Sequence, residues 1–468
     1  MNSVWQRLTL SNLSLQLWGP TSLLYRLAGF LRNWRKGSVL MLEWAEPLGA
    51  LLVAVVFAIA PFTSTTMIGM VLLACAAFFL LLLVSSEALG GITPIHLLVM
   101  LYWSIATVAT VLSPVRAAAV EGWSKLTLYL LFFGLMARVF RNPRLRSAVI
   151  TVYLLAALAV SVYGIRQWFF GADALATWVD TESTLAKTTR VYSFLGNPNL
   201  LAGYLLPSCF FSGAAVLAWR GWWPKALALL MTVLNSACLV LTFSRGGWIG
   251  FVVGGFLFML LVVQWWSQSL PGFWQKWATP LVLGSAVALV AIALVVVDPL
   301  RDRVLSMFAG REDSSNNFRL NVWAGVRDMI RARPILGIGP GNDAFNQVYP
   351  QFQRTGYTAL SAYSILLEVA VETGIIGLTC FLWLIVVTLT RGWERLQQLR
   401  QTGNQEAFWL IAAIATMVGM LAHGAVDTVW YRPQVSTLWW MMVALVASYS
   451  GVRPLPIEPK VGNRPLPT

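Results

Sequence analysis

Long apolar runs alternate with short polar segments along most of the chain. Runs of about 20 residues are long enough for a helix to cross the hydrocarbon core of a bilayer. The pattern therefore predicts an all-α integral membrane protein with about twelve transmembrane helices and one large extracytoplasmic loop. The predicted spans are 47–63, 66–86, 94–113, 122–140, 147–168, 198–219, 225–243, 247–266, 277–297, 364–390, 408–430 and 434–451.

The same pattern divides the chain into five parts. They are a cytoplasmic N-terminal segment (1–46), helices one to nine (47–297), the large loop (298–363), helices ten to twelve (364–451) and a cytoplasmic tail (452–468). In the first part, apolar residues from Leu23 to Trp34 recur at helical spacing opposite a basic face. This predicts an amphipathic helix on the membrane surface, with an ordinary solvated tail as the alternative.

Composition and charge support the membrane assignment. Hydrophobic residues make up 58% of the chain and charged residues 11%, whereas soluble domains contain roughly 25% charged residues. The net charge of +14 comes from Lys and Arg scattered between apolar runs, which argues against nucleic-acid binding. Positive loops on the inner side explain this distribution, so we expect both termini in the cytoplasm and the chain in the cell inner (plasma) membrane.

Metal and cofactor chemistry has little support in the sequence. The four cysteines, Cys75, Cys209, Cys238 and Cys380, all lie inside apolar runs without metal-ligand spacing, and the chain has only two histidines. We expect the cysteines to be packing residues and His96 to be structural. Neither a metal site nor a cofactor is predicted.

The large loop carries a helical pattern and then a turn. Apolar residues recur at helical spacing over 319–333, and Pro334 closes the predicted helix. The following "LGIGPGN", residues 336–342, predicts a tight turn that exposes backbone amides. Such a turn either presents these amides to an anion or is a plain connector.

Several polar residues at the predicted helix ends are candidates for anion binding. Arg245 in "LTFSRGGWIG" either snorkels to the interface or faces an anion in a central cavity. Arg190 precedes Asn197 and Asn199, which flank Pro198 at the start of the sixth helix. The asparagines either cap this helix or donate to a ligand.

Two acid-containing pairs lie in the predicted C-terminal helices. Glu368 and Glu372 are four residues apart, so we expect them to pair with Arg245, Arg319 or Arg190, or one of them to stay protonated. His423 and Asp427 share the same spacing and are expected on one helical face. That second pair either relays protons or locks helix packing.

An ordered set of motifs resembles a known superfamily over most of the chain. "FLGNPNLLAGYL", "LTFSRGGWIG", "FRLNVWAGVRDMIRARPILGIGPGN", "LLEVAVETGIIGL" and "AHGAVDTVWYRP" resemble the O-antigen ligase-like membrane proteins. The stretch from "GIGPGN" to "ETGIIGL" is most similar to the cyanobacterial branch named for inorganic carbon transporter B.

The resemblance implies roles for particular positions. Ligases of this superfamily hold the pyrophosphate of a polyprenyl-linked sugar donor with outer-face arginines, and the matching positions are Arg245 and Arg319. A loop histidine activates the acceptor in those ligases, but the His-Asn pair corresponds here to Tyr363 and Ser364. Tyrosine has a reference pKa near 10, so it is a poor general base at neutral pH.

Three functions remain open from the sequence. The first, which the branch resemblance favours, is inorganic carbon accumulation, with bicarbonate as the anionic guest and the two glutamates setting selectivity or proton coupling. The second is a ligase or polymerase acting on a polyprenyl-linked glycan at the outer face. The third is a non-catalytic scaffold. The loss of the loop histidine argues against standard ligase chemistry, and accessory subunits are not identified.

Overall fold

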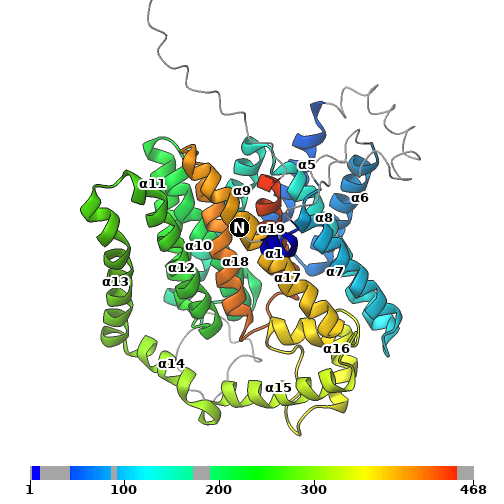
Figure 1. Ribbon diagram of the computed structural model, residues 1–468. Helices are drawn as coiled ribbons and strands as arrows, with labels where there is room; N and C mark the ends of the chain where they lie inside the picture. Colours follow the sequence, from blue (N-terminus) through cyan, green and yellow to red (C-terminus); the bar gives the residue numbers. More distant parts are fainter. Residues whose placement is uncertain (1–2, 11–42, 86–91, 172–189, 451–468) are drawn as a thin grey trace, which may run out of the picture.

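A computed structural model describes residues 3–10, 43–85, 92–171 and 190–450 (Figure 1). The predicted amphipathic helix and the C-terminal tail lie outside the described residues. In the described ranges the regular elements are helices, so the chain is an all-α protein. Twelve of these helices overlap the twelve predicted spans. They are α5 (Ala45–Ile59), α6 (Thr65–Ser85), α7 (Pro94–Val111), α8 (Arg116–Val139), α9 (Pro143–Phe170), α10 (Pro198–Ala218), α11 (Trp222–Leu241), α12 (Arg245–Trp266), α13 (Gly272–Val296), α17 (Ile365–Gln401), α18 (Ala407–Gly424) and α19 (Pro433–Ser450).

Nine helices within the described ranges are long and apolar enough to cross a membrane on their own. The other three of the twelve are α5, which has only 15 residues, α8 and α19. α10 and α18 are mostly buried inside the bundle, where they pack on each other and on α12. The four cysteines lie in the buried core and form no disulfide, as expected of packing residues.

Helix α13 stands apart from the rest of the bundle (Figure 1). None of its described side chains is buried, and it contacts the protein mainly through α12 and through the elements at its two ends. At its foot the chain enters the large loop, which begins with α14 (Asp298–Phe308).

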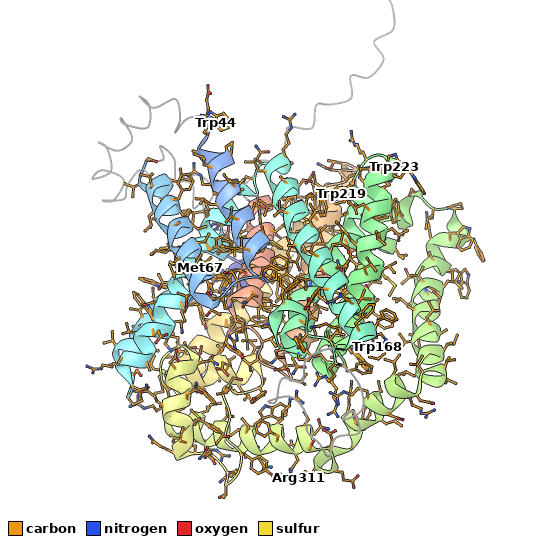
Figure 2. The ribbon with its side chains drawn as sticks, turned by 180° about the vertical axis from the view of Figure 1, so that it is seen from behind. Trp44, Met67, Trp168, Trp219, Trp223 and Arg311 are labelled. Carbon is orange, nitrogen blue, oxygen red and sulfur yellow. The ribbon has the colours of Figure 1, made fainter. Side chains whose placement is uncertain are left out.

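The large loop runs across one end of the bundle, which we call the loop face. Figure 1 shows α14 and α15 (Ser314–Ala332) extending beneath the bundle from the foot of α13 toward α16 (Asn342–Val348). Figure 2 shows Trp44, Trp219 and Trp223 at the opposite end from Arg311 of this loop. The predicted loop helix is therefore confirmed, and it begins five residues earlier than the pattern indicated.

A second, smaller hydrophobic core anchors the loop to the bundle. Val322, Val326 and Met329 form the buried stripe of α15, and they pack in one cluster with Phe345 of α16 and Ala119 of α8. The stripe lies at i, i+4 and i+7, as required of one face of a helix. It fixes α15 as a rigid wall of the loop face.

The glycine-rich turn is locked into a break in α17. Gly374 has φ 65° and ψ −169°, which interrupts the helix. The carbonyl groups of the preceding helical turn therefore lose their N–H donors. The turn supplies the missing donors, because the N–H of Ile338 donates to Val371 O and the N–H of Gly339 donates to Glu372 O, both at 2.9 Å. A Cβ on Gly374 would lie 2.1 Å from Ile335 O, so only glycine fits this position.

This turn therefore uses its amides internally, and the connector interpretation is the correct one. The N–H of Gly337 donates to Arg333 O at 3.2 Å, and the N–H of Gly341 donates to a side chain of α17.

His96 is structural, as expected: its Nδ1 lies 2.8 Å from Thr93 Oγ1 and caps the start of α7.

Candidate functional site

Arg245 is turned inward from the start of α12. The preceding turn places Phe243 in the left-handed region at φ 51°, and the Ser244 hydroxyl caps the helix by accepting from the Gly247 N–H. Only 6% of the arginine is exposed. Its Nη1 donates to Asp313 Oδ1 at 2.7 Å and to Asn316 Oδ1 at 3.0 Å, and its Nη2 pairs with Asp313 Oδ2. Snorkelling toward lipid is therefore wrong for this residue.

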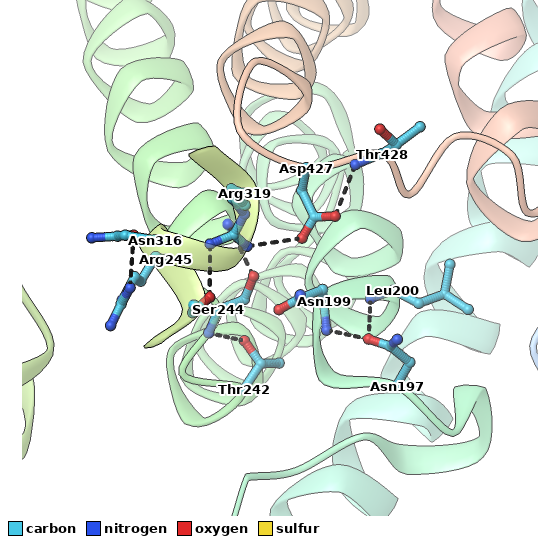
Figure 3. Close-up of polar contacts among 12 residues, drawn as sticks. Asn197, Asn199, Leu200, Thr242, Ser244, Arg245, Asn316, Arg319, Asp427 and Thr428 are labelled. Atoms are coloured by element: carbon cyan, nitrogen blue, oxygen red, sulfur yellow. Dashed lines mark hydrogen bonds and ion pairs between the residues drawn. The ribbon is translucent and has the colours of Figure 1, made fainter. Parts of the chain in front are cut away.

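Arg319 lies one helical turn beyond Ser315 on α15 and faces the same region. Its Nη1 donates to Ser315 Oγ at 2.9 Å, and its Nη2 lies 3.8 Å from Asp427 Oδ2. Figure 3 shows Arg319 and Asp427 directed toward each other, with Arg245 and Asn316 close by. The long ion-pair distance leaves capacity on the guanidinium for another acceptor.

The two arginines line one cavity of about 290 Å³ at the loop face. Asn316 joins them on its polar wall. The rest of the lining is mainly apolar and comes from α12, α14, α15 and the segment after α18: Ile249, Met307, Leu320, Trp323 and Val426. A cavity lined by both guanidinium groups and apolar side chains suits a ligand that carries both a charged group and a hydrocarbon part.

Two further arginines clamp the turn that carries Arg245. Arg190 Nε donates to Thr242 O at 3.0 Å, and Arg303 Nε donates to Phe243 O at 3.2 Å. We call Arg190, Arg245, Arg303 and Arg319 the arginine cluster. Arg303 was not singled out from the sequence. Its position could have been inferred from spacing. Arg303 follows Leu300 by three residues, so both lie on the face of α14 that packs against the core.

The arginine cluster has more positive than negative charge. Two of its four guanidinium groups form ion pairs with carboxylates, Arg245 with Asp313 and Arg319 with Asp427. Burial lowers the pKa of Arg190 to about 10 and that of Arg303 to about 9, and the neighbouring arginine charges act in the same direction. An anion placed in the cavity would relieve this repulsion.

The two asparagines have separate roles. Asn197 caps α10, because its Oδ1 accepts from the N–H groups of Asn199 and Leu200 at 2.8 and 3.2 Å. Asn199 accepts from Arg190 Nη2 at 3.2 Å and so holds that guanidinium beside the turn. The capping interpretation is therefore correct for Asn197, whereas Asn199 belongs to the surroundings of the arginine cluster.

His423 and Asp427 do not share a helical face. Helix α18 ends at Gly424, so Asp427 lies in the segment beyond it and turns to Arg319, while its Oδ1 accepts from the Thr428 N–H at 2.8 Å. His423 is buried against Gly246 of α12, and its Nε2 has no hydrogen-bond partner among the residues that the structure describes. The expected shared helical face is therefore wrong, because four-residue spacing places residues on one face only while the helix continues.

Tyr363 lies just before α17 with φ 49°, an uncommon backbone conformation for tyrosine. Its ring packs edge-on against Phe318 at a centroid distance of 5.4 Å. Burial first, and then the charge of nearby Asp427, raise the pKa of Tyr363 to about 12. At neutral pH the residue is therefore a neutral phenol.

The two glutamates of α17 bind backbone amides instead of arginines. Glu368 Oε2 accepts from the Ala362 N–H at 2.6 Å, and Glu372 Oε1 accepts from the Gly341 N–H at 2.7 Å. In the part of the chain that the structure describes, neither makes an ion pair, so the expected pairing with Arg245, Arg319 or Arg190 is wrong. The carboxylates instead pin both ends of segment 341–362 to α17, which sequence spacing could not indicate.

Comparisons with known proteins agree with this arrangement of motifs. Residues 230–382 match the family described as O-antigen ligase. This region includes Arg245 and Arg319 and the position of Tyr363. Over 225 residues the chain is 24% identical to a Rickettsia felis protein described as a "putative polysaccharide ligase", covering 47% of this chain and 51% of that protein.

A second protein with that description, from Rickettsia conorii, is 22% identical over 227 residues, with the same two coverages. The chain thus spans about half the length of the curated relatives it matches. These likenesses support the resemblance to the O-antigen ligase-like superfamily. None of them supports the link to inorganic carbon or to the cyanobacterial branch.

Proposed function

We propose that this membrane protein transfers a glycan from a polyprenyl pyrophosphate carrier to an acceptor hydroxyl at the loop face, as a ligase or polymerase. The observation that carries the proposal is the convergence of Arg245 and Arg319 on one cavity whose lining is otherwise mainly apolar. Guanidinium groups bind phosphate oxygens through paired N–H donors, and an isoprenoid chain requires apolar surroundings. The names of the two relatives favour the same class of reaction.

In this proposal the arginines stabilise the leaving group. The acceptor oxygen forms a bond to the anomeric carbon of the donor sugar while the bond from that carbon to the phosphate oxygen breaks. The electron pair of the broken bond leaves with the polyprenyl diphosphate, whose negative charge lies against Arg245 and Arg319. Fixed cationic donors of this kind lower the free energy of the transition state without reorganising.

We assign Asp427 the role of general base, which removes the proton from the acceptor hydroxyl. Tyr363 stands at the position of the family histidine but is protonated at neutral pH. Asp427 lies next to Tyr363 and within 3.8 Å of Arg319, so its carboxylate is placed beside the same cavity wall. As the acceptor attacks, its hydroxyl proton passes to Asp427, which then returns it to solvent or to a departing group.

Glycan transfer by the purified chain in bilayers tests this function. The assay supplies a polyprenyl pyrophosphate-linked glycan and a hydroxyl acceptor, and it measures the joined product. We expect Arg319→Lys and Arg245→Lys, which keep the charge but lose the paired donors, to slow transfer about 10²- to 10³-fold. Arg331→Ala is the matched control, since Arg331 lies on the same helix but pairs at the surface with Asp328. Absence of transfer by the native chain would refute the proposal.

Bicarbonate transport is the second candidate. The excess positive charge of the arginine cluster would attract any small anion. Bicarbonate flux into vesicles that contain only this protein measures it, with an Arg245→Ala variant for comparison. Equal background flux in both preparations would remove this candidate, whereas flux that the variant loses would place it ahead of glycan transfer.

A further inference from the structure

Arg245 binds an anionic group that belongs to the protein itself. Both of its terminal nitrogens bind the carboxylate of Asp313, one to each oxygen, and Nη1 also reaches Asn316 Oδ1. This is the fork-to-fork arrangement in which a guanidinium binds a carboxylate or a phosphate. The N–H groups that would hold the pyrophosphate of a donor are therefore occupied by the protein itself.

Asp313 is placed so that it can leave this position. It is the residue before α15, where its Oδ1 also accepts the N–H of Asn316 at 2.9 Å. Burial alone would raise the pKa of the Asp313 carboxyl, but hydrogen bonds from Arg245 and Asn316 and the charges of Arg245 and Arg303 lower it below its usual value. The carboxylate can thus give up the guanidinium and keep a backbone donor at the start of α15.

We propose that Asp313 occupies the position of the ligand's anionic group and that binding of a diphosphate displaces it from Arg245. The inference rests on the proposed function for the identity of that ligand. One set of N–H donors cannot serve two anions at once, so every ligand must compete with the resident carboxylate. Asp313 therefore determines which anions bind.

The competition favours a particular class of ligand. A bicarbonate ion carries a single charge and gains little by exchanging places with another singly charged carboxylate. A diphosphate ester carries more charge and more oxygens, so it can also engage Arg319, whose ion pair with Asp427 is long. The site should consequently select diphosphates over monoanions as long as Asp313 is present.

Anion binding by the full chain tests this competition. The probe is farnesyl diphosphate, titrated against the purified protein in nanodiscs and followed by calorimetry. We expect Asp313→Asn to bind it roughly tenfold more tightly than the native chain, because asparagine still caps α15 but removes the negative charge that pairs with Arg245. Asp328→Asn is the matched control, since Asp328 lies on the same helix and pairs at the surface with Arg331 and Arg354, and it should leave the affinity unchanged.

A second variant guards against local misfolding. Asp313→Ser also keeps a capping hydroxyl without charge and should show the same gain in affinity. Weaker or unchanged binding in both variants would overturn the inference, because Asp313 would then orient Arg245 instead of competing for it. Bicarbonate that displaces farnesyl diphosphate from the native chain as well as from Asp313→Asn would overturn the selectivity argument.

Failure of the proposed function gives a different result. In that case the native chain would not bind farnesyl diphosphate, or Arg245→Ala would bind it as well as the native chain does. Loss of binding in Arg245→Ala together with no gain in Asp313→Asn would refute only the role of Asp313.

Discussion

A buried guanidinium is stable only where its N–H groups find acceptors, and Arg245 finds three oxygens in the short segment from Asp313 to Asn316. That segment lies about 70 residues further along the chain, so no local pattern could have identified it as the partner. The sequence motifs singled out Arg245 and Arg319 as candidates for anion binding. They could not indicate which carboxylate each one binds.

Asp427→Asn tests the assignment of the acceptor proton. The amide keeps the size of the side chain but cannot accept the proton, so we expect kcat for glycan transfer to fall about 10²- to 10⁴-fold. Binding of farnesyl diphosphate should change far less, because Arg245 and Arg319 remain. Calorimetry and product formation measured on one preparation separate these two effects. A variant with nearly native kcat would show that another group removes the proton.

Tyr363→Phe tests whether the tyrosine titrates during the reaction. Because burial raises its pKa to about 12, the phenol stays protonated and contributes no ionisation from about pH 6 to about pH 10. The variant should therefore keep the shape of the native pH–rate profile over this range, and its rate should fall by less than about tenfold, because the ring and its packing against Phe318 are retained. A basic limb that appears only in the native profile would contradict this.

At the scale of elements, the apolar runs of the sequence located twelve helices, and nine of these, within the described ranges, also meet the length and apolarity that a bilayer requires of a span. The break in α17 did not follow. Gly374 stands within an apolar run that reads as continuous helix, and the break is stable only because a turn 35 residues earlier donates to the freed carbonyls. Long-range compensation of this kind leaves no periodic signal in the sequence.

Gly374→Ala tests this junction. A Cβ here would meet Ile335 O at 2.1 Å, and φ 65° with ψ −169° is strained for alanine, so we expect a loss of at least about 1–3 kcal/mol in the free energy of unfolding. Thermal unfolding in detergent measures the loss. Gly284→Ala on α13 is the control, since a Cβ there meets nothing within 4 Å, and it should be neutral or slightly stabilising. Equal stability of the two variants would contradict the role of the break.

At the scale of the whole molecule, both ends of the bundle carry arginines, but in different surroundings. The loop face holds the arginine cluster and the cavity, whereas Arg138, Arg146 and Arg400 lie at the other end, where Arg146 pairs with Glu406. The basic segments of the sequence predicted that the large loop and the residues near Arg138, Arg146 and Arg400 lie at opposite ends. They could not fix the shape of the cavity, because four separate elements contribute to its lining.

The orientation of the chain is a prediction that cysteine labelling can check. The native cysteines are buried, so they should give little background with a membrane-impermeant maleimide. We expect Gln353→Cys, exposed in the large loop, to react in intact cells and Gln401→Cys, exposed at the end of α17, to react only after permeabilisation. The native chain serves as the control. The reverse labelling pattern would place the loop face in the cytoplasm and exclude an outer-face reaction.

Because α13 stands apart from the bundle, we expect the surrounding lipid to influence its position. Since none of its described side chains is buried, we expect acyl tails to contact this helix on the sides that do not face α12. Its tilt will then follow the thickness of the hydrocarbon layer, and α14 will carry that adjustment toward Arg303 and the cavity. Changing the acyl-chain length of the lipid should therefore alter the cavity from outside the protein, without any change of sequence.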